Sequence, residues 1–251
     1  MAEALDSEIL DPIVVNGMKM LVRRNELVGD ILKRGDFEPA ETALLRTLVT
    51  PGETLLDLGA NVGYYTLLLS GLAKEGAVYA FEPDPGNFRL LTRNVELNDL
   101  HNVTLVRKAV SDFNGQARLY LAGYNQGDHR LFDSGDGRSS VCVDVVRLDD
   151  FLADRPGRIG FVKMDIQGCE ARALAGMAGI LDTHRPDILM EFWPAGIRMS
   201  GQDPQQTLER LAERGYGIHS LDGRPAQIPG ILESLSTEEA WTNLLCTGRR
   251  P

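Results

Sequence analysis

The stretch Leu55-Leu-Asp-Leu-Gly-Ala-Asn-Val-Gly63 decides the fold of this chain. Its apolar start predicts a buried strand that ends near Asp57, and the glycines Gly59 and Gly63 predict a tight turn. A helix is expected from Val62 onward. Open α/β sheets bind their ligands beyond the carboxyl ends of parallel strands, so we expect the functional site at this turn.

Strands and helices alternate after this stretch. Apolar runs of strand length are followed by segments whose apolar residues recur every three or four positions, as at Phe88, Leu91 and Val95. This alternation predicts an α/β fold with a seven-stranded, mostly parallel sheet and helices on both faces. The expected strands are 54–58, 77–81, 103–106, 159–164, 187–192, 216–221 and 240–247, the last two being an antiparallel pair joined by a long loop. The expected longer helices are a segment from Pro39, 62–73, a segment from Pro85, 170–181 and a segment from Pro204.

Two parts of the chain stand apart from this alternation. Residues 1–36 form an expected accessory segment, with a hairpin at Asn16-Gly17 and a short helix over 28–33. Residues 37–251 form the main domain, with an insertion at about 115–147. The insertion has two alternating strands around a mobile loop rich in Gly, Asp, Ser and Asn, of the kind that often carries binding groups.

Composition excludes several classes of function. The 251 residues suit one domain with additions, and 26 basic against 36 acidic side chains leave a net charge of −10. Such a chain repels polyanions, so no nucleic-acid partner is expected. Three widely spaced cysteines indicate free thiols in a reducing compartment. No signal peptide and no apolar run of about 20 residues is present, so we expect no membrane partner and a cytoplasmic location.

The charges around the glycine turn indicate which ligand it binds. The turn from Gly59 to Gly63 does not match Gly-x-Gly-x-x-Gly, and carboxylates follow three strands, at Asp57, Glu82 and Asp112. These carboxylates would repel a diphosphate. They suit S-adenosylmethionine, which carries a sulfonium and an ammonium cation. Glu82 is placed to accept hydrogen bonds from both ribose hydroxyls.

Four blocks of this sequence resemble one family over roughly residues 37–195. The blocks are Asp57-Leu-Gly-Ala-Asn-Val-Gly-Tyr-Tyr-Thr66, Phe81-Glu-Pro-Asp84, Ala109-Val-Ser-Asp112 and Val162-Lys-Met-Asp-Ile-Gln-Gly-Cys-Glu170. On these blocks the chain resembles the FkbM family of S-adenosylmethionine-dependent methyltransferases. The resemblance implies a class I, Rossmann-like methyltransferase fold and O-methylation of a hydroxyl on a small metabolite, either a natural product or a sugar.

The resemblance also implies roles for individual residues. It makes Asp57, Gly59, Asn61 and Gly63 the cofactor turn and Glu82 the ribose ligand, with the adenine edge at Ser111 and Asp112 and the methionine end near Glu38. The full set of expected cofactor residues is Glu38, Asp57, Gly59, Ala60, Asn61, Gly63, Tyr64, Glu82, Pro83, Asn87, Ser111, Asp112 and Asp165.

One position departs from the family pattern. The family usually shows Asp-x-Glu-Gly-x-Glu, whereas this chain has Gln167 in place of the first Glu. A role of that acid in metal binding or substrate contact is therefore not carried over, and we assign no metal ligands.

Three residues are candidates for the chemistry. Methyl transfer needs alignment of donor and acceptor, and a general base helps when the acceptor is an alkyl hydroxyl. Asp165 is the first candidate base, with a helix cap or a ligand of the methionine amine as the alternatives. Glu191 binds substrate or pairs with an Arg, and His129 acts as base or substrate ligand, or is simply solvated. Tyr64 and Trp193 are candidate walls of an acceptor pocket.

Three hypotheses follow. The first is an O-methyltransferase acting on a small hydroxylated acceptor, whose pocket is formed by residues 1–36 and 122–140. The second is a nucleotide-dependent oxidoreductase on a similar sheet. The third is a non-catalytic cofactor-binding module, which Gln167 favours. The sequence leaves the oligomeric state open, a homodimer included.

Overall fold

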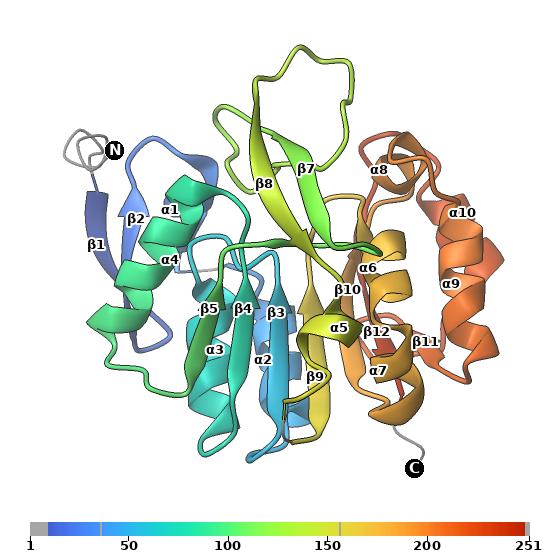
Figure 1. Ribbon diagram of the computed structural model, residues 1–251, viewed down its shortest axis with the longest axis horizontal. Helices are drawn as coiled ribbons and strands as arrows, with labels where there is room; N and C mark the ends of the chain where they lie inside the picture. Colours follow the sequence, from blue (N-terminus) through green and yellow to red (C-terminus); the bar gives the residue numbers. More distant parts are fainter. Residues whose placement is uncertain (1–9, 36, 156, 249–251) are drawn as a thin grey trace.

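The computed structural model describes residues 10–35, 37–155 and 157–248, and its centre is a seven-stranded sheet (Figure 1). All neighbouring strands are parallel except for β12, which runs antiparallel to both of its neighbours. This order and direction confirm the class I methyltransferase fold. Across the sheet, the strands are β11 (Gly217–His219), β12 (Thr242–Thr247), β10 (Asp187–Phe192), β9 (Ile159–Met164), β3 (Thr54–Leu58), β4 (Val78–Phe81) and β5 (Val103–Val106).

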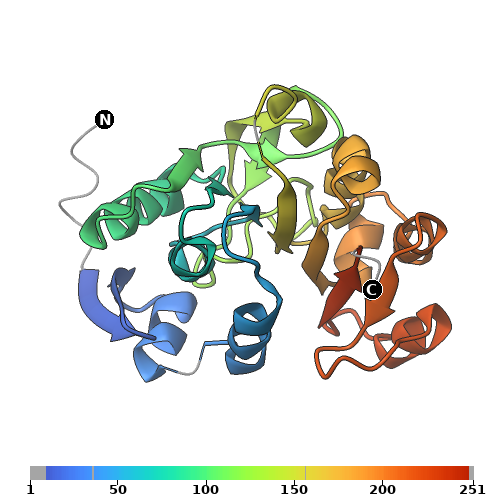
Figure 2. The same cartoon turned by 90° about the horizontal axis from the view of Figure 1, so that it is seen from below.

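Helices cover both faces of the sheet because its central strands are apolar on both sides. Along β3, Leu55 packs into one core and Leu56 into the other, as the alternation of side chains across a strand requires. The two helical layers lie on opposite sides of the sheet when the molecule is seen from below (Figure 2). On the Leu55 side are α2 (Pro39–Leu48), α3 (Tyr64–Ala73) and α4 (Pro85–Leu97). On the Leu56 side are α5 (Leu148–Phe151), α6 (Glu170–Gly176), α7 (Ala178–Thr183), α8 (Pro194–Met199), α9 (Pro204–Glu213) and α10 (Ile228–Ser234).

The helix predicted over 170–181 was wrong as a single element. It is broken at Met177 into α6 and α7. At the break a Cβ on Gly176 would lie 2.0 Å from the backbone oxygen of Ser111, so the chain passes too close to its neighbour for any larger residue. The long loop predicted before the last strand was also incomplete, because it contains α10.

The hairpin predicted at Asn16-Gly17 is confirmed. Both turn residues have positive φ, 51° and 81°, and they join β1 (Leu10–Val15) to β2 (Met18–Arg23). The hairpin is attached to α4 through Asn94, whose Oδ1 accepts from the Leu21 N–H at 2.7 Å and whose Nδ2 donates to the Leu21 carbonyl at 3.1 Å. An amide side chain thus pairs with the strand edge as a neighbouring strand would. The division of the chain at residue 36 stays a prediction.

The insertion forms a separate small sheet above the carboxyl ends of the main strands (Figure 1). Its hairpin consists of β7 (Gly115–Tyr120) and β8 (Ser140–Val146), and β6 (Ala109–Val110) pairs with β8 in parallel. The loop between β7 and β8 folds back over the main sheet. In the described part of the chain, no helix is long and apolar enough to cross a bilayer.

The loop of the insertion is tied to the N-terminal segment. The N–H of Leu27, at the start of α1 (Leu27–Arg34), donates to the Tyr124 carbonyl at 3.3 Å. The Gln126 N–H donates to Glu26 Oε1 at 3.2 Å, and the Asn87 amide donates to the Gln126 carbonyl at 3.0 Å. Residues a hundred positions apart therefore form one cover over the carboxyl edge of the sheet.

Candidate functional site

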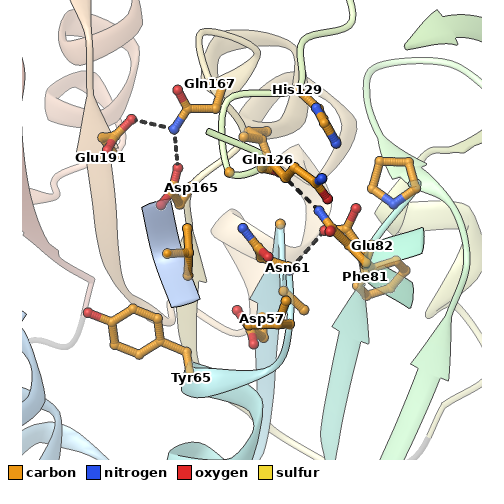
Figure 3. Close-up of a pocket in the computed structure, with 18 of the residues that line it drawn as sticks. Asp57, Asn61, Tyr65, Phe81, Glu82, Gln126, His129, Asp165, Gln167 and Glu191 are labelled. Carbon is orange, nitrogen blue, oxygen red and sulfur yellow. Dashed lines mark hydrogen bonds between the residues drawn. The ribbon is translucent and has the colours of Figure 1, made fainter. Parts of the chain in front are cut away.

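A cavity of about 250 Å³ lies between this cover and the ends of the strands (Figure 3). Two groups of residues, polar except for Gly59, face it. We call Asp57, Gly59, Asn61 and Glu82 the turn end, and Asp165, Gln167 and Glu191 the carboxylate end. The remaining wall is largely apolar and comes from α1 and the segment after it, from β6, from the insertion and from the segment before β12. It includes Leu27, Val28, Ile31, Phe37, Val110, Leu119, Leu131 and Trp241.

The glycine turn brings the two ends close together. Gly59 has φ +84°, and a Cβ there would lie 1.9 Å from the backbone oxygen of Asp165. Only glycine permits both this conformation and this approach. Asn61 is also left-handed, at φ +49°. Asp57 is buried beneath the turn, where Thr66 Oγ1 donates to its carboxylate at 2.6 Å and burial raises its pKa to about 6.

Glu82 is held by the main chain. One carboxylate oxygen accepts the Asn61 N–H at 2.8 Å and the other accepts the Asp84 N–H at 2.8 Å. A carboxylate has about four acceptor positions, so each oxygen keeps one free. Burial raises the pKa of Glu82 to about 8. The side chain is oriented, lines the cavity, and fits two hydroxyl donors such as those of a ribose.

The carboxylate end is held by a side chain. Gln167 Nε2 donates to Asp165 Oδ1 at 2.7 Å and to Glu191 Oε1 at 2.9 Å (Figure 3). Burial and the nearby Asp165 raise the pKa of Glu191 well above its ordinary value. Glu191 therefore contacts an amide, not the Arg offered as one alternative. Gln167 itself has φ +51°, an uncommon conformation for a residue other than glycine.

Asp165 is free to face the cavity. The helix-cap alternative is wrong, because the N-cap of α6 is Cys169 and the carboxylate that accepts the neighbouring N–H groups belongs to Glu170. Lys163 Nζ lies 3.9 Å from Asp165 Oδ2. The Gln167 amide and this ammonium are therefore the two groups that hold the Asp165 side chain in place.

Lys163 and Tyr65 line the cavity without having been predicted. Lys163 is 1% exposed on β9, and Tyr65 donates a short hydrogen bond to Glu38, whose pKa is raised by burial. The sequence did contain a signal for Lys163, because it is the only charged residue within an apolar strand. It also precedes Asp165 by two positions, which places both side chains on the same face of the strand. Tyr65 carried no comparable sign beside the equally aromatic Tyr64.

Most of the expected cofactor residues line this cavity, and three do not. Glu38, Asp57, Gly59, Ala60, Asn61, Tyr64, Glu82, Pro83, Asn87 and Asp165 are in its wall. Gly63 is outside it, as the left-handed N-cap of α3. The lining also lacks Ser111, whose backbone is pressed against Gly176, and Asp112, which lies 3.6 Å from the Arg172 guanidinium. Ala109 and Val110 take their place.

The other candidates are placed as follows. His129 lines the cavity, and its Nδ1 accepts the Ala122 N–H at 3.0 Å. In the neutral imidazole the proton is then on Nε2, and burial lowers the pKa of His129. This geometry suits a hydrogen-bond donor to a ligand better than a base. Trp193 is absent from the lining, since its ring lies under Arg130, and Trp241 is the indole that lines the cavity.

Several known proteins similar to this chain are methyltransferases. The family described as "Methyltransferase FkbM domain" matches residues 57–218. Methyltransferase 1 of Beauveria bassiana is 29% identical over 144 residues, 49% of this chain and 57% of that protein. The 31-O-demethyl-FK506 methyltransferase FkbM of Streptomyces tacrolimicus is 31% identical over 160 residues, 51% of this chain and 60% of that protein. The chain thus matches less than two thirds of either relative.

A solved structure is similar at the level of the fold. It is the methyltransferase FkbM of Methylobacillus flagellatus, at 23% identity and a TM-score of 0.49. The similarity covers 78% of this chain and 43% of that one.

Proposed function

The chain belongs to the FkbM family of methyltransferases, and from that premise we propose that it methylates a hydroxyl oxygen of a small metabolite with S-adenosylmethionine as donor. The observation that carries the proposal is Glu82, a buried carboxylate with both oxygens oriented by backbone N–H groups and with acceptor positions left for two ribose hydroxyls. The acidic cavity suits a cationic cofactor. The acceptor class follows the relative whose name describes an O-demethylated substrate.

The residues fit the reaction as follows. S-adenosylmethionine supplies an electrophilic methyl group on a sulfonium. Glu82 holds the ribose and Asp57 lies under the amino-acid end. Asp165 accepts the proton of the acceptor hydroxyl, since it lines the cavity and is held there by the Gln167 amide and the Lys163 ammonium. Glu191, with its raised pKa, acts as a hydrogen-bonding group and not as the base.

The cover over the cavity excludes water and provides the apolar surface against which the acceptor is oriented. Alignment of donor and acceptor in such a closed site contributes several kcal/mol to the rate, and a general base contributes about 10²–10⁴-fold. The acceptor is expected to combine an apolar body, which packs on the wall formed by Ile31 and Leu131, with a hydroxyl that reaches Asp165.

Glu82→Ala tests the assignment. S-adenosylhomocysteine affinity is expected to fall by at least about a hundredfold, because two hydrogen bonds to a charged group are lost at about 1.5–3 kcal/mol each. The measurement is calorimetric titration, with circular dichroism to check the fold and Glu96→Ala on the exposed side of α4 as the control. Unchanged affinity in Glu82→Ala would refute the ribose site.

A second candidate function rests on Gln167, the residue that replaces the usual family acid. It is a cofactor-binding module without turnover. Both candidates predict stabilisation by S-adenosylhomocysteine, about 2.7 kcal/mol at a hundred times the dissociation constant. Only the methyltransferase adds the mass of one methylene to an acceptor, which mass spectrometry of incubated hydroxylated metabolites detects.

A further inference from the structure

Lys163 is a buried ammonium group with unused donors. It lies on β9 opposite Asp57 of β3, and the residue is 1% exposed. Asp165 Oδ2 is 3.9 Å from Nζ and the centre of the Tyr65 ring is 4.9 Å from it, distances of an ion pair and a cation–π contact. Among the described residues, Nζ has no hydrogen-bond partner. A hydrogen bond from an ammonium requires an acceptor at about 2.7–3.2 Å.

The surroundings keep this group charged. Burial alone disfavours an ammonium, but Asp165, Glu38 and Glu191 together raise the pKa of Lys163 above its ordinary value. The three N–H donors are therefore present at neutral pH, and their charge is compensated only at longer range. Buried polar groups in folded proteins are nearly always hydrogen-bonded, so a donor group of this kind in a cavity wall indicates a ligand acceptor.

The cavity offers few other cations. Of the described side chains that line it, only Lys108 and Lys163 are positive at neutral pH. Lys108 follows β5, two strands away from β3, and its Nζ lies 3.7 Å from Asp144. An anionic group that binds near the centre of the sheet thus has Lys163 as its cationic partner.

We propose that Lys163 Nζ binds the carboxylate of the cofactor's amino-acid end; the proposal rests on the function proposed above. An α-amino acid carries its ammonium and its carboxylate on one carbon. Asp57 and Lys163 occupy paired positions on adjacent strands, about 4.8 Å apart. They therefore present a carboxylate and an ammonium side by side, with charges opposite to those of the amino-acid end. Asp57 then receives the ammonium and Lys163 the carboxylate.

A different role for Lys163 is to hold Asp165 in place, with no contact to the cofactor. The two roles differ in which ligand atoms matter. If Lys163 only positions Asp165, its loss lowers turnover and leaves the affinity of every cofactor fragment nearly unchanged. If it binds the carboxylate, its loss matters only for ligands that carry one.

The test is a titration of wild type and Lys163→Met with three ligands, followed by calorimetry. The ligands are S-adenosylhomocysteine, its decarboxylated amine analogue, and 5′-methylthioadenosine, which lacks the whole amino-acid end. We expect the substitution to weaken S-adenosylhomocysteine roughly ten- to a hundredfold, as for loss of a hydrogen bond between charged groups. The other two ligands are expected to change less than about threefold. Methionine has a similar volume. Removal of one partner of a buried ion pair is strongly destabilising, so urea denaturation first checks that Lys163→Met is folded under the conditions of the titration.

The same titrations give a second result, from the comparison of the change in the ligand with the change in the protein. Removal of the carboxylate from the ligand is expected to weaken binding to wild type by about the same factor as removal of the ammonium from the protein, and the two losses are not expected to add. Equal affinity of Lys163→Met and wild type for S-adenosylhomocysteine, or an equal loss for all three ligands, overturns the proposal. Failure of wild type to bind any of the three refutes the proposed function instead.

Discussion

At the turn end of the cavity the Glu82 carboxylate is oriented by two backbone N–H groups, whereas at the carboxylate end Asp165 and Glu191 are oriented by the side-chain amide of Gln167. Backbone donors are set by the path of the chain and survive most substitutions. A side-chain donor is removed by a single one. The turn end is thus suited to a constant ligand such as a cofactor, and the carboxylate end is the part that substitution can adapt to a particular acceptor.

Gly59→Ala is expected to damage both ends at once and to have the largest effect. The new methyl group would overlap the Asp165 carbonyl, and alanine is strained at φ +84°. Left-handed strain of about 1–2 kcal/mol and overlap of about 1–3 kcal/mol sum to a loss of roughly 3 kcal/mol in the free energy of unfolding. Urea denaturation measures it.

Gly123→Ala is the matched control for this variant. Gly123 lies in the exposed loop of the insertion, its Cβ position has no atom within 4 Å, and its φ is not positive. A change within about 0.5 kcal/mol is expected there. Similar losses in the two variants would mean that the turn does not depend on the close approach to Asp165.

The second prediction isolates the turn end through its pH dependence. The free protein holds Glu82 with a pKa of about 8, raised by burial, so the carboxyl is largely protonated at pH 6. Ribose hydroxyls donate to the ionised form, and binding must expel this proton. The affinity for 5′-methylthioadenosine is therefore expected to rise between pH 6 and pH 8, with a limiting slope of about tenfold per unit, and to level off above pH 8.

This probe has the ribose but no ionisable amino-acid end. It therefore lacks the charged groups that are proposed to bind Lys163 and Asp57, and its pH dependence reports on the ribose site. Glu82→Gln removes the titrating group, and its binding is expected to be weak and nearly independent of pH over the same range. A flat profile in wild type would show that Glu82 is not the ribose ligand.

The turn end was predictable because residues that are close together in the sequence determine its geometry. The spacing of Gly59 and Gly63 after an apolar strand gives the turn, and Glu82 at the next strand end follows from the order of a parallel sheet. Strand bounds such as Thr54–Leu58 were predicted for the same reason, since both faces of each central strand are apolar. Helix α4 was found from its Asp84 cap, whose side chain accepts the Asn87 N–H.

The cover and the carboxylate end were not predictable to the same degree. Glu26 meets Gln126 only because the insertion folds back over α1, and no local pattern records a contact across a hundred residues. Ser111 was expected at the cavity from its place after a strand, but the close passage of Gly176 diverts it. Gln167 was recognised as a departure from the family pattern, yet its two hydrogen bonds depend on the positions of β9 and β10.

The smallest expected effect concerns the carboxylate end. Gln167→Glu replaces the shared donor with a third carboxylate between Asp165 and Glu191, so two hydrogen bonds become repulsions. The loss of stability is expected to be about 1–2 kcal/mol at pH 8. The neighbouring acids raise the pKa of the new carboxyl in the folded protein above its value of about 4 in the unfolded chain. The loss of stability is therefore absent below about pH 4, where the carboxyl is protonated in both states, and it grows as the pH rises. Turnover falls with it, because Asp165 is displaced from the acceptor, while 5′-methylthioadenosine affinity stays the same.

Gln116→Glu supplies the same chemical change in a different setting. Gln116 Nε2 also donates to a carboxylate, Asp144 at 3.1 Å, but on the exposed surface of the insertion. Solvent screens the repulsion there, so a change of less than about 0.5 kcal/mol is expected. Guanidinium denaturation of both variants at pH 4 and pH 8 compares them. Equal effects of the two substitutions, or a loss of 5′-methylthioadenosine affinity in Gln167→Glu, would show that the carboxylate end does not vary independently of the turn end. The distinction between carboxylates held by the backbone and carboxylates held by a side chain would then fail.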